Sequence, residues 1–162
     1  MLGDLETVIK MRDVLDSQED VGVASSLIFL ENGNYLACEN YQKGIQFEFA
    51  NKALFRNPSK KTYHKTEIGT MFIYADQVVN FFLAKRAVFR DIAWDNRIKI
   101  EWEHIDFFLQ LLKSPWKAAV TLETKAVHQM YTPDSDYARF RRNAPSAYFY
   151  QKNGIQAVIN RF

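Results

Sequence analysis

The segment from Arg97 to Trp116 constrains the fold most, because its hydrophobic period changes in the middle. Ile98, Ile100 and Trp102 alternate with charged residues, which is typical of a strand with one buried face. The apolar residues that follow lie on one helical stripe, made of Ile105, Phe108, Leu109 and Leu112 and widened by Phe107 and Leu111. Pro115 ends this helix, since the residue before a proline disfavours the α region. A strand that leads into so apolar a helix predicts a sheet on which the helix packs.

Length and composition indicate one soluble globular domain. The chain has 162 residues, of which 48 % are hydrophobic and 25 % are charged, and this is typical of folded domains. No apolar run reaches the ~18 residues of a membrane span, and the acidic N-terminus lacks the basic start of a signal peptide. We therefore expect no membrane partner and an intracellular location, in the cytoplasm or, for a viral protein, the host cytoplasm. The single cysteine, Cys38, excludes a cysteine-based zinc cluster and is predicted to be a buried thiol.

Charge is distributed unevenly along the chain. Residues 1–31 contain seven acidic and two basic side chains, a net charge of −5, so residues 32–162 carry +7 of the total of +2. We divide the single domain 1–162 into an acidic N-terminal segment at 1–22, a basic body, and a basic and aromatic C-terminal arm and hairpin at 133–162. The acidic patch Asp16, Glu19 and Asp20, with the Gly22 that follows, is interpreted as a solvated connection, although an acidic segment could also compete with a polyanion for the basic body.

Alternating patterns and turn signals predict an α+β fold. Its mainly antiparallel sheet, built from hairpins and a meander, is packed by one or two amphipathic helices and could be a strongly curved sheet or a partial barrel. The remaining predicted elements are a helix at 4–16 with Asp4 as N-cap, a strand meander at 25–50 with its first turn at Asn32-Gly33, a strand at 67–74, a helix at 75–86, strands at 88–94 and 117–130, and a hairpin of 148–151 and 155–160 across Asn153-Gly154.

Two segments interleave basic and aromatic residues, as a surface for single-stranded nucleic acid requires. Basic side chains neutralise phosphates, and exposed rings stack on unpaired bases at ~1–3 kcal/mol each. One segment is the predicted loop at 51–66, the other follows the breaker cluster at 133–136, and the strand at Arg97 adds cations to the predicted sheet. The candidate binding residues are Lys52, Arg56, Lys60, Lys61, Tyr63, Lys65, Arg97, Lys99, Tyr137, Arg139, Phe140, Arg141 and Arg142. For both segments the alternative is a solvated loop that some of its rings tie to the core.

Motifs for metal or cofactor chemistry are weak. His64, His104 and His128 are far apart and show no metal-binding spacing. The chain has no G-x-S-x-G motif, Walker loop or dinucleotide fingerprint. We therefore predict no cofactor, no metal and no catalytic residues.

One short stretch resembles a nuclease motif. Glu123-Thr124-Lys125, after the apolar run 118–122, resembles the E-x-K half of the metal-dependent nuclease motif PD-(D/E)-x-K. In that family an aspartate and the glutamate hold Mg²⁺ while the lysine orients the attacking water. The nearest aspartates are Asp106, in the predicted helix, and Asp95, in a predicted turn. An exposed strand with alternating charges is the other interpretation of this stretch.

In element order the chain is similar to the single-strand-binding coactivator and Whirly class of folds, and more loosely to OB-type barrels. We predict a non-enzymatic protein that binds single-stranded DNA or RNA with little sequence preference and forms a homo-oligomer or larger assembly. The alternatives are a structural subunit of a virus particle or larger complex, docked through the acidic segment and the C-terminal hairpin, and a Mg²⁺-dependent nuclease-like domain. The last residues could also add a strand to a neighbouring subunit.

Overall fold

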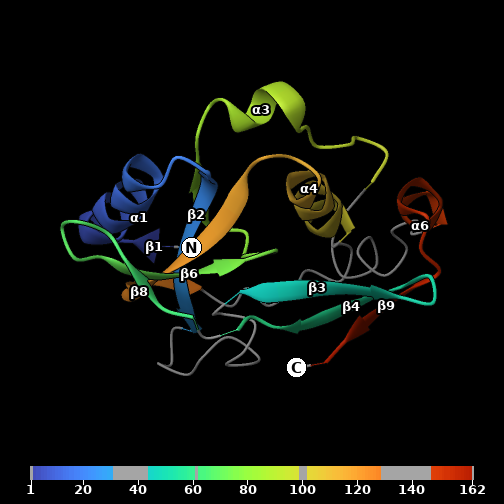
Figure 1. The fold of residues 1–162 in the computed structure, drawn as a ribbon, viewed down its shortest axis with the longest axis horizontal. Helices are drawn as coiled ribbons and strands as arrows, with labels where there is room; N and C mark the ends of the chain where they lie inside the picture. The colour runs from blue at the N-terminus through green and yellow to red at the C-terminus, as the bar shows by residue number, and fades with distance from the viewer. Residues whose placement is uncertain (1, 31–43, 61, 99–101, 129–146, 162) are drawn as a thin grey trace.

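The structure, a computed structural model, describes residues 2–30, 44–60, 62–98, 102–128 and 147–161. These residues form two β-sheets and a set of helices packed on them (Figure 1). The helices are α1 (Leu5–Ser17), α3 (Val88–Asp91), α4 (Trp102–Leu112) and α6 (Ala147–Asn153).

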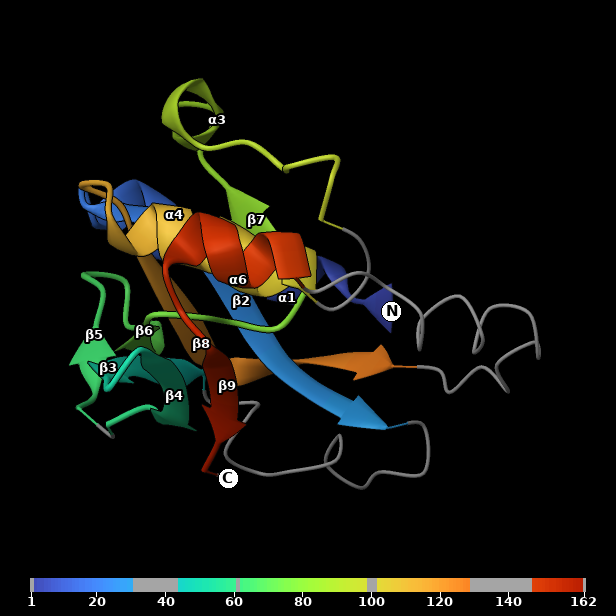
Figure 2. The same cartoon turned by 90° about the vertical axis from the view of Figure 1, so that its right-hand side faces the viewer.

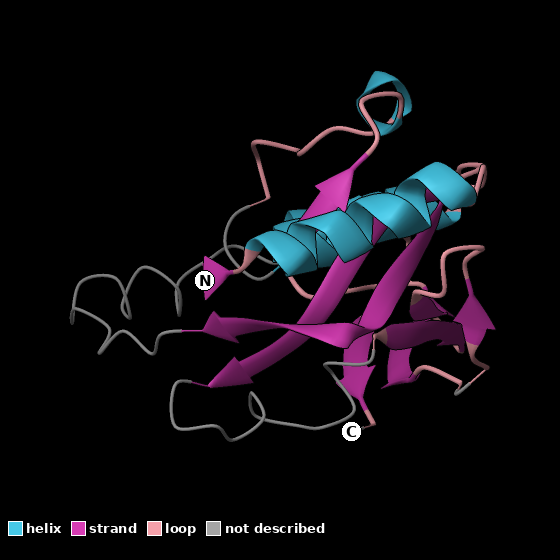
Figure 3. Ribbon diagram, turned by 90° about the vertical axis from the view of Figure 1, so that its left-hand side faces the viewer, coloured by secondary structure: helices cyan, strands magenta, loops and turns pink. Residues whose placement is uncertain are grey.

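The sheets are mostly antiparallel. The larger one has the order β5 (His64–Lys65), β6 (Met71–Ala75), β8 (Lys117–His128), β2 (Val21–Leu30) and β7 (Phe82–Ala84), with β1 (Leu2–Gly3) also paired to β8. The smaller one has the order β3 (Ile45–Ala50), β4 (Ala53–Pro58) and β9 (Ala157–Asn160). Only the β2–β8 and β4–β9 pairs of these described strands are parallel. The predicted α+β class is confirmed. The sheets are twisted, and the described strands do not close into a barrel (Figure 3).

Helix α1 covers one face of the larger sheet. The Asp4 carboxylate accepts a hydrogen bond of 2.7 Å from the Thr7 amide, which confirms the predicted N-cap. Met11, Val14 and Leu15 of this helix are buried against the sheet. The predicted helix at 4–16 is therefore confirmed.

Helix α4 lies on the opposite face of the larger sheet and is buried on two sides. Phe107 and Phe108 pack against that sheet, while Ile105 and Leu109 pack toward the smaller sheet and α6 (Figures 1 and 2). Each such buried side chain contributes about 1.5–3 kcal/mol by leaving water. This explains why the apolar stripe of the predicted helix is so wide. The predicted strand at 117–130 is also found, as β8.

The two sheets meet at one corner. The Ile45 amide donates to the Gln77 carbonyl (2.8 Å), and the Ile45 carbonyl accepts in return from the Gln77 amide (3.0 Å), which joins the start of β3 to the chain just after β6. The Ser59 hydroxyl adds a 2.7 Å hydrogen bond to the Tyr74 carbonyl at the other end of this junction. The smaller sheet is thus held as an extension of the larger one.

Only the first and last strands of the predicted meander at 25–50 are described, because its middle strand lies outside the described residues. Among the described strands, β2 pairs with β7 and β8, and β3 pairs with β4. The Asn32-Gly33 turn lies outside the described residues, as does Cys38. The predicted loop at 51–66 contains the strands β4 and β5. β4 pairs with β3 across a two-residue hairpin turn, in which Asn51 and Lys52 adopt positive φ although neither is glycine.

Three predictions between 75 and 102 are also wrong. Residues 75–86 are not a helix, because the backbone at Gln77 pairs with β3 and Phe82–Ala84 forms β7. Residues 88–91 are a helix instead of part of a strand. No strand begins at Arg97, because the Asp95 carboxylate accepts a 3.0 Å hydrogen bond from the Arg97 amide and stabilises a turn there.

The predicted C-terminal hairpin is wrong as well. Residues 147–153 are helix α6, and β9 runs parallel to β4. Gly154 adopts φ +65° directly after the helix, and the Ile155 amide donates to the Tyr150 carbonyl at 3.1 Å. An Asn-Gly pair suits a helix C-terminus as well as a hairpin turn. Here it ends a helix.

Candidate functional site

Three neighbouring side chains at one edge of the larger sheet form the surface that we call the basic edge: Lys60, Tyr63 and Lys65. All three are exposed, and Tyr63 is 57 % accessible to solvent. Neither lysine makes an ion pair within the described part of the chain. The basic edge therefore presents an exposed ring, between two lysines in the sequence that have no carboxylate partner among the described residues.

The chain around the basic edge is fixed on both sides. Before it, the Ser59 amide donates to the Gly44 carbonyl at 3.2 Å. After it, the Thr66 hydroxyl donates to the Asp13 carboxylate of α1 at 2.6 Å and accepts from the Thr70 amide at 3.0 Å. Gly69, with φ +101°, completes this turn. The exposed residues thus sit on a short, anchored segment.

A cluster of rings lies beside the basic edge on the face of the sheet that carries α1. The His64 ring stacks on Phe72, with centroids 5.4 Å apart, and meets the edge of Tyr74 at 4.9 Å. Lys117 lies 5.1 Å from the centre of the Tyr74 ring, and its ammonium is 2.6 Å from Asp20. That hydrogen bond lowers the pKa of Asp20, while burial raises the pKa of Tyr74.

Lys52 is separated from the basic edge. It lies in the turn between β3 and β4, whereas Lys60 follows the far end of β4. Lys52 is exposed, and its carbonyl accepts from the Gln156 amide at 2.7 Å. The structure therefore does not place Lys52 on the same surface as Lys60 and Lys65.

Arg56, predicted to contact phosphate, is buried with only 8 % of its surface accessible. Its guanidinium donates to the Gln77 side-chain oxygen at 3.1 Å and to the Asn160 side-chain oxygen at 2.9 Å. Arg56 therefore joins β4 to β9 and to the corner between the sheets, and this corrects its predicted place on a binding surface.

Arg97 belongs to a group of polar side chains that we call the salt-bridge cluster: Asp95, Arg97, Asp106, Tyr148 and Lys152. Arg97 lies 3.0 Å from Asp95 and 4.3 Å from the centre of the Tyr148 ring. Hydrogen bonds from Arg97, together with those from Lys152 and Tyr148, lower the pKa of Asp95. The Arg97 cation is thus already neutralised.

Asp106 is the buried member of the salt-bridge cluster, with 1 % of its side chain accessible. It accepts hydrogen bonds from Lys152 at 2.7 Å, Gln110 at 2.8 Å and Asn153 at 3.1 Å. Lys152 and Asn153 come from α6, so these bonds fix α6 against α4. The cluster therefore has a structural role in the described fold.

The other predicted binding residues lie outside the described residues. They are Lys61, Lys99, Tyr137, Arg139, Phe140, Arg141 and Arg142.

The residues that resemble a nuclease motif contact different parts of the fold. Glu123 is 3.4 Å from Lys10 of α1, while Lys125 lies 5.1 Å from the centre of the Phe29 ring. Asp95 and Asp106 are held in the salt-bridge cluster instead. Within the described part of the chain, no three His, Cys, Asp or Glu side chains are arranged to hold a metal ion.

A second basic and aromatic surface was missed by the sequence analysis. It is formed by the exposed residues Arg86, Phe89, Arg90 and Trp94 on and beside α3, whose Val88 is buried in the core against β2 and β8 (Figure 1). Phe89 is 49 % and Trp94 42 % accessible, although Trp94 also stacks on Phe107 at 4.7 Å. The alternation of arginines with rings between 86 and 94 is the same signal that drew attention to 51–66.

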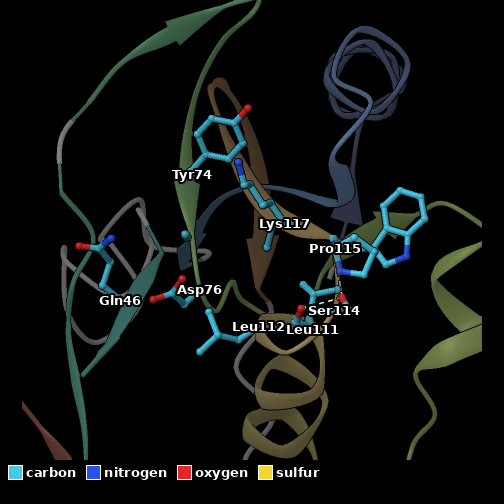
Figure 4. A pocket seen from close by; sticks show the side chains of 11 residues that line it. Gln46, Tyr74, Asp76, Leu111, Leu112, Ser114, Pro115 and Lys117 are labelled. Carbon is cyan, nitrogen blue, oxygen red and sulfur yellow. Dashed lines mark hydrogen bonds between the residues drawn. The ribbon is translucent and has the colours of Figure 1, made fainter. Parts of the chain in front are cut away.

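A cleft of about 380 Å³ opens at the C-terminal end of α4 (Figure 4). One wall is the end of β6 with Tyr74 and Asp76, and the other is the chain from Leu111 to Lys117, which leaves α4 and enters β8. Burial raises the pKa of the Asp76 carboxyl, and a 2.8 Å hydrogen bond from the Phe47 amide opposes this shift. No sequence motif marked this cleft, because its walls come from elements far apart in the chain.

Comparisons with known proteins give no relative from which a function could be carried over: no protein-family model, no curated protein and no solved structure matches this chain. None of the described helices has the length and apolar character needed to cross a bilayer.

Proposed function

We propose that this protein binds single-stranded nucleic acid with little sequence preference, and that the basic edge is a main contact surface. The observation that carries the proposal is the exposure of Tyr63 between Lys60 and Lys65, whose charges are not neutralised by any described carboxylate. An exposed ring can stack on an unpaired base, and the flanking ammonium groups can neutralise the adjoining phosphates.

The neighbouring ring cluster supports this proposal. His64 and Tyr74 are half-buried, and their rings meet edge to face with centroids 4.9 Å apart. Sheet faces with aromatic side chains are a common platform for unpaired bases. Lys117 adds little charge, since Asp20 already neutralises it. The interaction would therefore depend on stacking and on the two lysines of the basic edge.

Little sequence preference is expected from such a surface. Lysine ammonium groups contact phosphates as point charges, and every base offers a face on which a ring can stack. Base identity is read by hydrogen bonds to base edges, and the basic edge offers few groups for this purpose, namely the Tyr63 hydroxyl and the two flexible ammonium groups.

Fluorescence anisotropy with a labelled single-stranded oligonucleotide tests the proposal. We expect binding at ~50 mM salt that weakens steeply as salt is raised, because released counterions contribute to the affinity. Lys60→Ala combined with Lys65→Ala should weaken binding and flatten the salt dependence by about 0.7 per lost phosphate contact. Lys52→Ala removes the same kind of exposed charge at the other end of β4 and should have little effect. Absence of binding at low salt, or equal effects of all three lysines, would overturn the proposed contact surface.

Self-assembly is a second candidate function, favoured by the outer face of α1. Leu5, Val8 and Ile9 form one turn of exposed apolar surface there, and Leu5 is 74 % accessible. Apolar residues at this spacing are typical of a helix that packs on a partner. Light scattering after size exclusion tests this: we expect a dimer or larger species for the native chain and a monomer for Ile9→Lys. A native monomer at all concentrations would exclude assembly through α1.

A further inference from the structure

The cleft at the end of α4 contains a carboxylate that lacks a cation. Asp76 is half-buried and accepts one hydrogen bond, from the Phe47 amide at 2.8 Å. No basic side chain of the described residues lies within ion-pair distance of Asp76. Lys117, which also lines the cleft, is held by Asp20 at 2.6 Å. Removing a carboxylate from water without a counter-charge is unfavourable, so the site would gain from a ligand that brings a positive charge.

The end of α4 favours a positive charge at the same place. The last carbonyl groups of a helix carry the negative end of its macrodipole. Leu111, Leu112 and Ser114, from the last turn of α4 and just after it, line the cleft (Figure 4). Ser114 donates through both its amide and its hydroxyl to the Leu111 carbonyl, at 3.0 and 2.7 Å. The field of this helix end adds to that of Asp76.

The remainder of the cleft is apolar or aromatic. Leu111, Leu112 and Pro115 form one wall, and Tyr74 lies at one end (Figure 4). A volume of about 380 Å³ is within the range of small-molecule sites, which are mostly apolar with a few placed polar groups. The walls therefore suit a hydrophobic or aromatic body of modest size.

From these features we infer that the cleft binds a small organic cation, a protonated amine on an aromatic or apolar body, with the ammonium group against the Asp76 carboxylate. This site is separate from the basic edge and does not depend on nucleic-acid binding. The ammonium would donate a charge-assisted hydrogen bond to the Asp76 oxygen that does not accept from Phe47, and the body would pack on Pro115 and the leucines.

Calorimetric titration of the full chain with two matched probes tests the inference. Tryptamine carries an ammonium group, whereas tryptophol has the same indole body with a neutral hydroxyl. We expect tryptamine to bind about tenfold or more tightly than tryptophol, as one charge-assisted hydrogen bond would provide. Asp76→Asn should abolish this preference while keeping the hydrogen bond from Phe47, because an amide oxygen also accepts. Asp91→Asn, the same change at an exposed carboxylate on α3, should preserve it.

A spectroscopic measurement locates the bound probe without any variant at Asp76. Asp76 and Leu112 lie on opposite walls of the cleft, whereas Trp94 and Trp102 contact rings elsewhere. Tryptamine should shift the backbone amide resonances of Asp76 and Leu112 and leave the indole N–H resonances of Trp94 and Trp102 unchanged. Equal affinity for tryptamine and tryptophol, no binding of either at millimolar concentration, or shifts confined to Trp94 or Trp102 would overturn the inference.

Discussion

The basic edge and the salt-bridge cluster share one sequence signature and differ in structure. Both place tyrosine among lysine or arginine. At the basic edge the lysines have no described carboxylate partner and Tyr63 is exposed. In the cluster Arg97 and Lys152 are paired with Asp95 and Asp106, and the Tyr148 ring is covered by Arg97. The difference lies in the carboxylates that the fold brings to each set of cations.

Lysine and arginine therefore have two roles in this chain: paired with carboxylates they stabilise the fold, and without such partners they are available for binding. Buried pairs orient helices against each other, and their removal costs stability because a charge is left without its partner. Unpaired surface cations contribute little to stability and remain available for phosphate. Changes in the cluster should therefore alter stability without altering nucleic-acid affinity, and changes at the basic edge should do the reverse.

The largest effect is expected from Asp106→Ala. It removes the acceptor of three hydrogen bonds and should lower the free energy of unfolding by about 3 kcal/mol, the lower end of the range for a broken buried pair, because Lys152 keeps Asp95. Chemical denaturation measures this. Asp91→Ala, at an exposed position, is the control and should change stability by less than about 0.5 kcal/mol. Equal effects of the two substitutions would show that the cluster does not hold α6 against α4.

A smaller loss of stability is expected on acidification, from Asp95. Hydrogen bonds from Arg97, Lys152 and Tyr148 lower the pKa of Asp95, so the folded state binds this proton less tightly than the unfolded state. The contribution of Asp95 to stability is therefore complete above its unfolded pKa of ~4 and is lost as the pH falls toward the lowered value. Denaturation midpoints measured from pH 7 downward should fall less steeply for Asp95→Asn than for the native chain. Parallel curves would contradict this assignment.

At the basic edge, Tyr63→Ala should weaken nucleic-acid binding and leave stability nearly unchanged. Loss of one stacked base corresponds to ~1–3 kcal/mol of binding free energy, and Tyr63 is too exposed to contribute much to the core. The affinity should fall for all sequences alike, and Tyr63→Phe should retain most of it. Fluorescence anisotropy with pyrimidine and purine oligonucleotides measures the affinity of each variant for each sequence. A loss confined to one sequence, or an equal loss in Tyr63→Phe, would indicate hydrogen bonding by the hydroxyl.

Structure that depends on residues close together in the sequence was predicted well, whereas structure that depends on contacts with distant parts of the chain was not. The cap at Asp4 and the apolar stripe of α4 depend on residues within a few positions of each other, and both were found. Asn153-Gly154 suits two structures, and the choice between them depends on α6 packing against α4 through Asp106. The strand expected at Arg97 fails for a similar reason, because Asp95 holds a turn that Tyr148 and Lys152 support.

The same distinction between local and distant contacts applies to the predicted binding residues. Exposure of Lys60, Tyr63 and Lys65 follows from a short anchored segment beside a proline that ends β4. Arg56 occurs in the same stretch, yet Gln77 and Asn160 draw it into the interior from distant parts of the chain. The cleft at Asp76 left no signal, since a carboxylate without a cation is defined only by what surrounds it in space.

The smallest effect, and the sharpest test of the comparison, is expected from Arg97→Ala. Arg97 was predicted from the sequence to contact nucleic acid, but its guanidinium is 3.0 Å from Asp95 and stacked on Tyr148. Phosphate would have to displace both partners, so we expect Arg97→Ala to leave the affinity and its salt dependence unchanged. Since the Arg97 side chain is 66 % accessible, its loss should change stability little. If Arg97→Ala instead weakens binding as much as Lys60→Ala does, Arg97 must exchange its carboxylate partner for phosphate. Pairing with a carboxylate in the folded chain would then not decide which surface binds nucleic acid.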